Sequence, residues 1–152
     1  GIAPIYKHKL YLKSSKYYEM DNELVLKELK SAPDFLNFSI EHNLDVIKNP
    51  LILNKQEHGI DHVFELDDTN INTPSAILFD PDTNRRLTLY TNYPAIVVYT
   101  DNYPSHTLNQ ANAINEENFG ITFETAIPTL DLNRLTFDKD KEYHFVSKYL
   151  FD

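Results

Sequence analysis

Two carboxylates lie inside apolar segments, and this placement makes them candidates for acid–base chemistry. The first is Glu124, in the stretch 119–126, which reads FGITFETA and has the pattern of a β-strand. Because successive side chains of a strand point to opposite faces, Glu124 shares its face with Thr122 and Ala126. These small neighbours would leave room for a substrate above the carboxylate. A solvated surface glutamate is the alternative interpretation, since most glutamates are exposed.

The second carboxylate is Asp61, in the segment 57–66, which reads EHGIDHVFEL. Alternation predicts a strand here, with His62, Phe64 and Leu66 on the core side. Asp61 then faces the other way, together with Val63. Two carboxylates can divide the work of proton transfer when their surroundings separate their protonation states.

Other kinds of site have weaker support in the sequence. His58 and His62 are four residues apart with Asp61 between them, but this is a helical ligand spacing that a strand would spread out, so we expect no metal site. The chain has three glycines and no glycine-rich phosphate loop, and no serine lies in a nucleophile elbow. It has no cysteine, which excludes disulfides, thiolate nucleophiles and cysteine-ligated metals.

Composition limits the partners and the location. The net charge of −9 would repel nucleic acids and anionic membranes, whereas neutral polar partners such as sugars remain. No apolar run approaches the ~20 residues of a membrane span, and residues 1–15 contain no signal-peptide hydrophobic region. The absence of cysteine agrees with a cytoplasmic protein. The length of 152 residues suits one domain, 1–152.

The elements that must position the carboxylates are mainly strands. Ten tyrosines, nine phenylalanines and many short runs of period two favour an all-β domain, an antiparallel β-sandwich. We expect strands at 8–12, 16–20, 61–66, 75–79, 86–91, 95–100, 119–126 and 143–151, with a hairpin across the turn at 80–84. Segment 23–29 could be a strand or a helix, segment 38–48 permits a short helix, and 101–118 reads as a long surface loop.

These motifs together resemble those of the aldose 1-epimerase (galactose mutarotase) family. Residues 59–64, GIDHVF, resemble its glycine-x-aspartate-histidine-x-phenylalanine element, and 75–100 resemble the strand pair that follows, with arginines at 85 and 86. Residues 119–124, FGITFE, resemble the family's strand that carries a glutamate, followed by Pro128 and Asn133. Tyr143, Phe145 and Tyr149 resemble its last strand. The match runs in order along most of the chain.

The resemblance implies a large antiparallel β-sandwich of the galactose mutarotase type, which binds a hexose such as galactose or glucose on one face. Glu124 would be the general base that takes the proton of the anomeric hydroxyl, and Asp61 would hydrogen-bond a sugar hydroxyl. A protonated histidine would donate to the ring oxygen. The ring would then open, and closure after rotation would give the other anomer. This chemistry needs no cofactor.

The chain also departs from the family pattern. The motif that holds the family's acid histidine does not occur here, Thr125 and Ala126 replace the usual glutamine after the glutamate, and Ala95 replaces a glycine. We therefore interpret 1–152 as the C-terminal portion of a mutarotase-like protein that holds the base but lacks the acid. Exposed strand edges in such a portion would favour self-association or pairing with the missing part.

Two alternatives to an aldose 1-epimerase remain open at this stage. One is a relative that acts on a sugar phosphate, for which we would expect a basic phosphate-binding patch; the acidic balance of the chain argues against it. The other is a mutarotase-like carbohydrate-binding protein without catalysis, because a binding cleft also uses carboxylates to hold sugar hydroxyls.

Overall fold

Two antiparallel sheets face each other in a computed structural model that describes residues 3–49, 58–108, 112–130 and 132–152. Among these residues, sheet A has the strand order β10-β7-β6-β1-β4 and sheet B the order β3-β2-β5-β8-β9. Sheet A comprises β10 (Ser147–Phe151), β7 (Arg85–Thr91), β6 (Ala76–Asp80), β1 (Lys9–Leu12) and β4 (His42–Asn43). Sheet B comprises β3 (Leu26–Ser31), β2 (Lys16–Met20), β5 (Asp61–Glu65), β8 (Ala95–Tyr99) and β9 (Thr122–Ala126). The predicted all-β antiparallel sandwich is confirmed.

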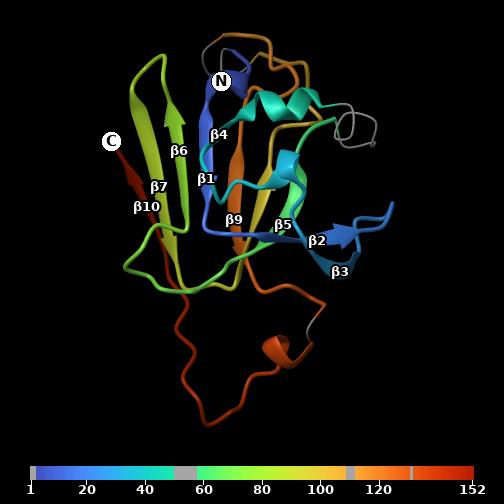
Figure 1. Ribbon diagram of the computed structural model, residues 1–152, viewed down its shortest axis with the longest axis vertical. Coiled ribbons are helices and arrows are strands. Elements are labelled where there is room, and N and C mark those ends of the chain that lie inside the picture. Colours follow the sequence, from blue (N-terminus) through green and yellow to red (C-terminus); the bar gives the residue numbers. More distant parts are fainter. Residues whose placement is uncertain (1–2, 50–57, 109–111, 131) are drawn as a thin grey trace.

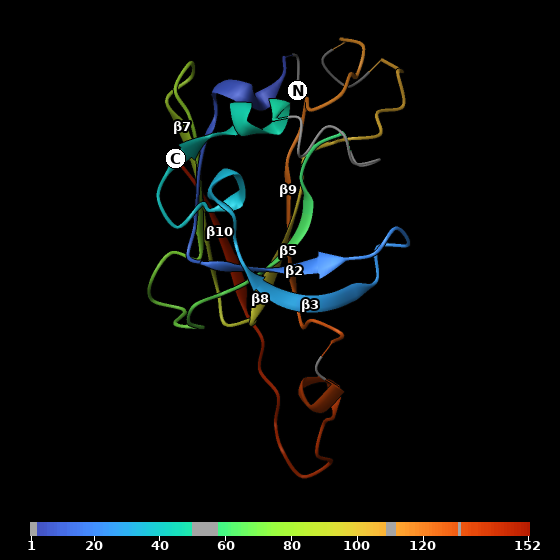
Figure 2. The same ribbon diagram turned by 45° about the vertical axis from the view of Figure 1, so that its right-hand side comes forward.

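The views of the ribbon show how the layers are arranged. β1, β6, β7 and β10 form one layer, while β5, β8 and β9 stand in the other and β2 and β3 run across its lower part (Figures 1 and 2). Four short 3-10 helices are described: η1 (Ile5–Lys7), η2 (Asp34–Leu36), η3 (Leu44–Lys48) and η4 (Leu132–Leu135). The described residues of segment 127–146, which contains η4, lie below both sheets (Figure 2). No helix among the described residues is long and apolar enough to cross a membrane.

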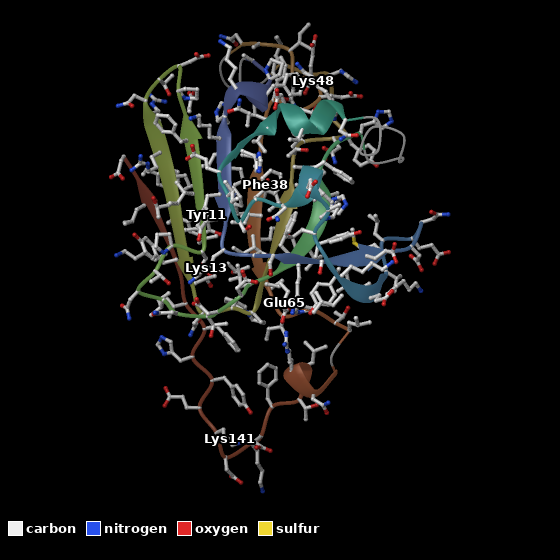
Figure 3. The ribbon with its side chains drawn as sticks, viewed as in Figure 1. Tyr11, Lys13, Phe38, Lys48, Glu65 and Lys141 are labelled. Carbon is white, nitrogen blue, oxygen red and sulfur yellow. The ribbon has the colours of Figure 1, made fainter. Side chains whose placement is uncertain are left out.

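The core forms because the strands alternate as the sequence predicts. In β5, His62 and Phe64 are buried, and Asp61 and Val63 are more exposed on the other face. Phe64 packs edge-to-face on Phe38, with ring centroids 6.1 Å apart, and Phe38 lies near the middle of the molecule (Figure 3). The predicted hairpin is also confirmed, since β6 and β7 pair across the 80–84 turn.

Several expected elements differ in extent from their predictions. Of the segment 23–29, which was open between strand and helix, residues 26–29 belong to a strand, β3, which pairs with β2. The strand expected at 119–126 begins at Thr122. The expected helix at 38–48 is reduced to η3, in which Leu44 and Ile47 are buried three residues apart, the period of a 3-10 helix. The last strand begins at Ser147 rather than Tyr143.

β10 begins late because the side chain of Asn92 binds the backbone just before it. The amide of Asn92 donates to the carbonyl of His144 at 2.8 Å, and its oxygen accepts the N–H of Val146 at 2.7 Å. These side-chain bonds occupy backbone groups that a longer strand would use for its ladder. The strand pattern of the sequence therefore extends further than the strand itself.

Candidate active site on the outer face of sheet B

Asp61 and Glu124 lie on the same face of sheet B. Opposite residues of antiparallel strands share a face, and Glu124 is opposite Val97, which in turn is opposite Val63. Asp61 is two residues from Val63, so it also belongs to this face, which points away from the core. One strand, β8, lies between the two carboxylates, and Asp61 is two residues along the strand from the position opposite Glu124, so their backbones are about 12 Å apart.

The floor between the carboxylates is made of Val97 and Tyr99 of β8. Glu124 is exposed, with Thr122 and Ala126 beside it on the strand, as the alternation predicts. Ala95, Val97 and Tyr99 of β8 share this face, and Tyr99 is opposite both Asp61 and Thr122. Apolar side chains and a tyrosine ring between two carboxylates suit a sugar, whose ring presents apolar C–H faces and a rim of hydroxyl groups.

The charge of Glu124 acts on Asp61. Partial burial raises the pKa of Asp61 above its usual range, and the negative charge of Glu124 raises it further. Because a like charge acts only over a short distance in water, this coupling supports a common site for the two groups. Carboxylates with different surroundings are typical of acid–base sites, although structural clusters also show them.

We expect the raised pKa of Asp61 to appear in the pH dependence of stability. The charged form is disfavoured in the fold, so the native state binds more protons than the unfolded chain and stability falls as pH rises from about 3.8 through the native pKa. Asp61→Asn should therefore raise the free energy of unfolding at pH 7, and this gain should vanish below the unfolded pKa. Urea unfolding at pH 3 and pH 7 measures it.

Asp21→Asn provides a control of opposite sign. The pKa of Asp21 is lowered, mainly by a hydrogen bond from Lys27, so its charged form stabilises the fold. This variant should lose stability at pH 7 and little at pH 3, by a small amount because the group is exposed. If both variants changed the free energy of unfolding at pH 7 in the same direction, the burial of Asp61 would be contradicted.

A buried polar network fixes the start of β5, just before Asp61. The hydroxyl of Thr100 accepts the N–H of Ile60 at 2.9 Å, and the amide of Asn102 donates to the carbonyl of Ile60 at 3.1 Å. Asn118 donates to the carbonyl of Thr100 at 3.0 Å and so ties the end of the 101–118 loop to the same point. Gly59 leaves the space that Asn102 fills. Sequence reasoning missed this network; the only signal was a polar run, TDN, directly after an apolar strand.

The structure adds Tyr149 of β10 to the neighbourhood of Glu124. Its hydroxyl donates to the carbonyl of Phe123 at 2.9 Å. Burial raises the pKa of Tyr149, and the charge of Glu124 raises it further, so the phenol stays protonated to higher pH than usual. The sequence indicated Tyr149 only as part of the last strand.

A third carboxylate on this face, Glu65, is held in an ion pair. Its Oε1 accepts a hydrogen bond from Arg134 Nη1 at 2.7 Å, and its Oε2 accepts the hydroxyl proton of Tyr18 at 2.6 Å. Arg134 belongs to η4, which lies below the end of β5 where Glu65 is labelled (Figure 3). This pair attaches segment 127–146 to sheet B, so we assign Glu65 a structural role.

The two histidines nearest to Asp61 do not join it on the open face. His62 is 3% exposed and points into the core, where its Nδ1 accepts the N–H of Asp61 at 3.1 Å. His58 lies 3.8 Å from the carboxylate of Glu117, before the strand begins. Within the described residues there is no group of three or more histidine, aspartate or glutamate side chains that could hold a metal ion.

Comparison with known proteins identifies the family. A profile described as aldose 1-epimerase matches residues 3–149. The fold is similar to that of a GalM/aldose epimerase homologue from C. elegans, with a TM-score of 0.78 and 15% identity over 98% of this chain and 46% of that one. It is also similar to a galactose 1-epimerase from Lactobacillus acidophilus, with a TM-score of 0.74 and 24% identity over 98% and 45% of the two chains.

The chain therefore spans less than half the length of these two relatives. No curated protein sequence matches it significantly. The family profile, by contrast, covers nearly the whole chain, including the segments that carry Asp61 and Glu124. The resemblance seen in the sequence is confirmed, and the chain belongs to the aldose 1-epimerase family.

Proposed function

We propose that the chain binds a hexose on the open face of sheet B and catalyses the exchange of its α and β anomers. Glu124 takes the proton of the anomeric hydroxyl, the electrons form the carbonyl, and the bond from the first carbon to the ring oxygen breaks. The open-chain sugar rotates about the bond between its first two carbons, and the reverse steps close the other anomer. The observation that supports this best is the placement of Asp61 and Glu124 on one face, with the charge of one raising the pKa of the other.

Asp61 has a different role in this proposal. It is partly buried and stands across β8 from Glu124, so it accepts a hydrogen bond from a sugar hydroxyl and fixes the pose of the ring. Positioning of this kind makes the base effective, because proton transfer needs a donor and an acceptor within hydrogen-bond reach. No cofactor enters this reaction. A place in hexose metabolism of the cytoplasm is part of the same proposal and agrees with the cysteine-free composition.

The ring oxygen takes its proton from solvent in this scheme. The acid-histidine motif of the family does not occur in the sequence, and His62 points into the core. A positioned general acid or base contributes roughly 10²–10⁴-fold to a rate. We therefore expect the rate of anomer exchange to gain the contribution of a general base but not that of a general acid.

Polarimetry of freshly dissolved α-D-galactose and α-D-glucose tests the proposal. The approach to the equilibrium rotation should be faster with the chain than in buffer alone, and the added rate should rise in proportion to protein concentration. Heat-denatured protein at the same concentration provides the control. A rate equal to the buffer rate for both sugars, at all protein concentrations, would contradict catalysis.

A carbohydrate-binding protein without catalysis is the second candidate, and the missing acid-histidine motif favours it. It predicts saturable binding of a hexose without faster anomer exchange. NMR titration of backbone amides in β5, β8 and β9 with galactose distinguishes the two functions. Shifts of these amides together with a buffer rate of exchange would support binding alone, whereas neither shifts nor exchange would contradict both functions.

A further inference from the structure

The edge strands of the two sheets meet beside the candidate base. Among the described residues, β9 is an edge strand of sheet B and β10 an edge strand of sheet A. Side-chain hydrogen bonds join them: the hydroxyl of Tyr149 donates to the carbonyl of Phe123 at 2.9 Å, and the hydroxyls of Thr125 and Ser147 lie 2.8 Å apart. An edge strand has outward backbone groups without a ladder partner. Tyr149 supplies a partner for one of these groups in β9.

The bonded carbonyl belongs to the peptide unit that leads to Glu124. The carbonyl of Phe123 and the N–H of Glu124 share one planar group, so a bond to one end fixes the orientation of the whole plane. The side chain of Phe123 is buried in the core, which holds the preceding residue from the inner side. The plane before Glu124 is therefore held by core packing and by Tyr149.

Tyr149 is 41% exposed and is placed by the pairing of its strand and by the hydrogen bond of its hydroxyl. It pairs with Leu89 of β7, a fully buried residue, so its side chain points toward the inner face of sheet A. Its pKa is raised, so the hydroxyl keeps its proton and remains a donor across the neutral and mildly alkaline range. The carboxylate of Glu124 is also exposed, and in the described contacts only its strand holds it.

We propose that Tyr149 is a positioning residue, whose hydroxyl fixes the peptide plane before Glu124 and so orients this carboxylate toward the anomeric hydroxyl. The role rests on the proposed function for its effect on rate, but the effect on the strand stands on geometry alone. Tyr149 does not transfer a proton in the reaction. It limits the orientations that Glu124 can adopt, and misplacement of a catalytic group by ~1 Å can cost up to about 10²-fold in rate.

Tyr149→Phe tests this role because it removes the hydroxyl and keeps the ring. We expect kcat for anomer exchange to fall by about tenfold, with KM changed by less than about twofold because Asp61 and the floor of the face remain. Amide hydrogen exchange at Glu124 should become about fivefold faster, as expected for the loss of one ordinary hydrogen bond, while the amides of β2 and β5 keep their wild-type rates.

Tyr143→Phe is the matched control. The hydroxyl of Tyr143 also bonds a backbone group, accepting the N–H of Asp138 at 2.8 Å, but it lies in segment 127–146 away from Glu124. This variant should keep the wild-type kcat and the wild-type exchange at Glu124. A difference between the two variants thus reports the contact with Phe123 and not the loss of a phenol.

The outcomes separate this role from the proposed function. If the wild type does not accelerate anomer exchange, the proposed function fails, and faster amide exchange confined to Glu124 and its neighbours in Tyr149→Phe still supports the positioning role. Unchanged exchange at Glu124 would overturn it. Exchange that becomes faster throughout sheet B would also overturn it, because it would show that Tyr149 only stabilises the fold.

Discussion

Glu124→Gln is expected to bring the rate of anomer exchange close to the rate in buffer. The amide has nearly the size of the carboxylate and still hydrogen-bonds the sugar, but it cannot take the proton of the anomeric hydroxyl. Since a general base contributes roughly 10²–10⁴-fold, a loss of that order should appear in kcat, with KM within about twofold of the wild type. Polarimetry with α-D-galactose measures the rate, and NMR titration measures sugar binding.

Glu23→Gln is the control for this variant. Glu23 lies in the exposed turn between β2 and β3, far along sheet B from Glu124, so the same chemical change there should leave the rate unchanged. A Glu124→Gln variant with the wild-type rate would show that another group is the base. Loss of sugar binding in this variant would instead assign Glu124 to binding.

Gly59→Ala is expected to destabilise the fold by about 3 kcal/mol or more. An added Cβ would lie 2.6 Å from the hydroxyl oxygen of Thr100 and closer still to Oδ1 of Asn102, both in the buried network before Asp61. Overpacking a tight site costs about 1–3 kcal/mol, and a displaced buried hydrogen-bonding group costs a similar amount. Urea unfolding, followed by circular dichroism, measures the difference.

Gly120→Ala is the matched control in the same part of the molecule. Its added Cβ would be 3.7 Å from Asp101, an ordinary contact, so we expect a change within about 0.5–1 kcal/mol. If both variants lost a similar amount of stability, the cause would be the loss of glycine's backbone freedom and not a clash with Asn102. A Gly59→Ala variant as stable as the wild type would contradict the close packing of the network.

The strands could be predicted where one face of each is buried. The segments that became β7 and β8 alternate or are continuously apolar, and the turn at 80–84 marks the hairpin, so local pattern was sufficient there. The two-residue β4 and the 3-10 helices are too short to leave a periodic signal. Residues 143–146 do not join β10 because their backbone binds Asn92, which is more than 50 residues away in sequence.

The two carboxylates of the candidate site could be proposed from the sequence, but their relative position could not. Alternation places Asp61 and Glu124 on the outer sides of their strands, but only the register of β5, β8 and β9 puts them on one face. The hydrogen bonds of Asn102, Asn118 and Tyr149 join segments that are distant in sequence. In sequence, polar residues in a long loop look solvated, and a tyrosine in a strand looks like core.

The most direct test of the claim that Asp61 and Glu124 form one site is an NMR titration of the Asp61 carboxyl carbon in the wild type and in Glu124→Gln. In the wild type the pKa of Asp61 should lie above its usual range, because of burial first and the charge of Glu124 second. Removing that charge should lower the pKa of Asp61, while burial keeps it above that of an exposed aspartate. An Asp61 pKa that is the same in both proteins would contradict a shared site.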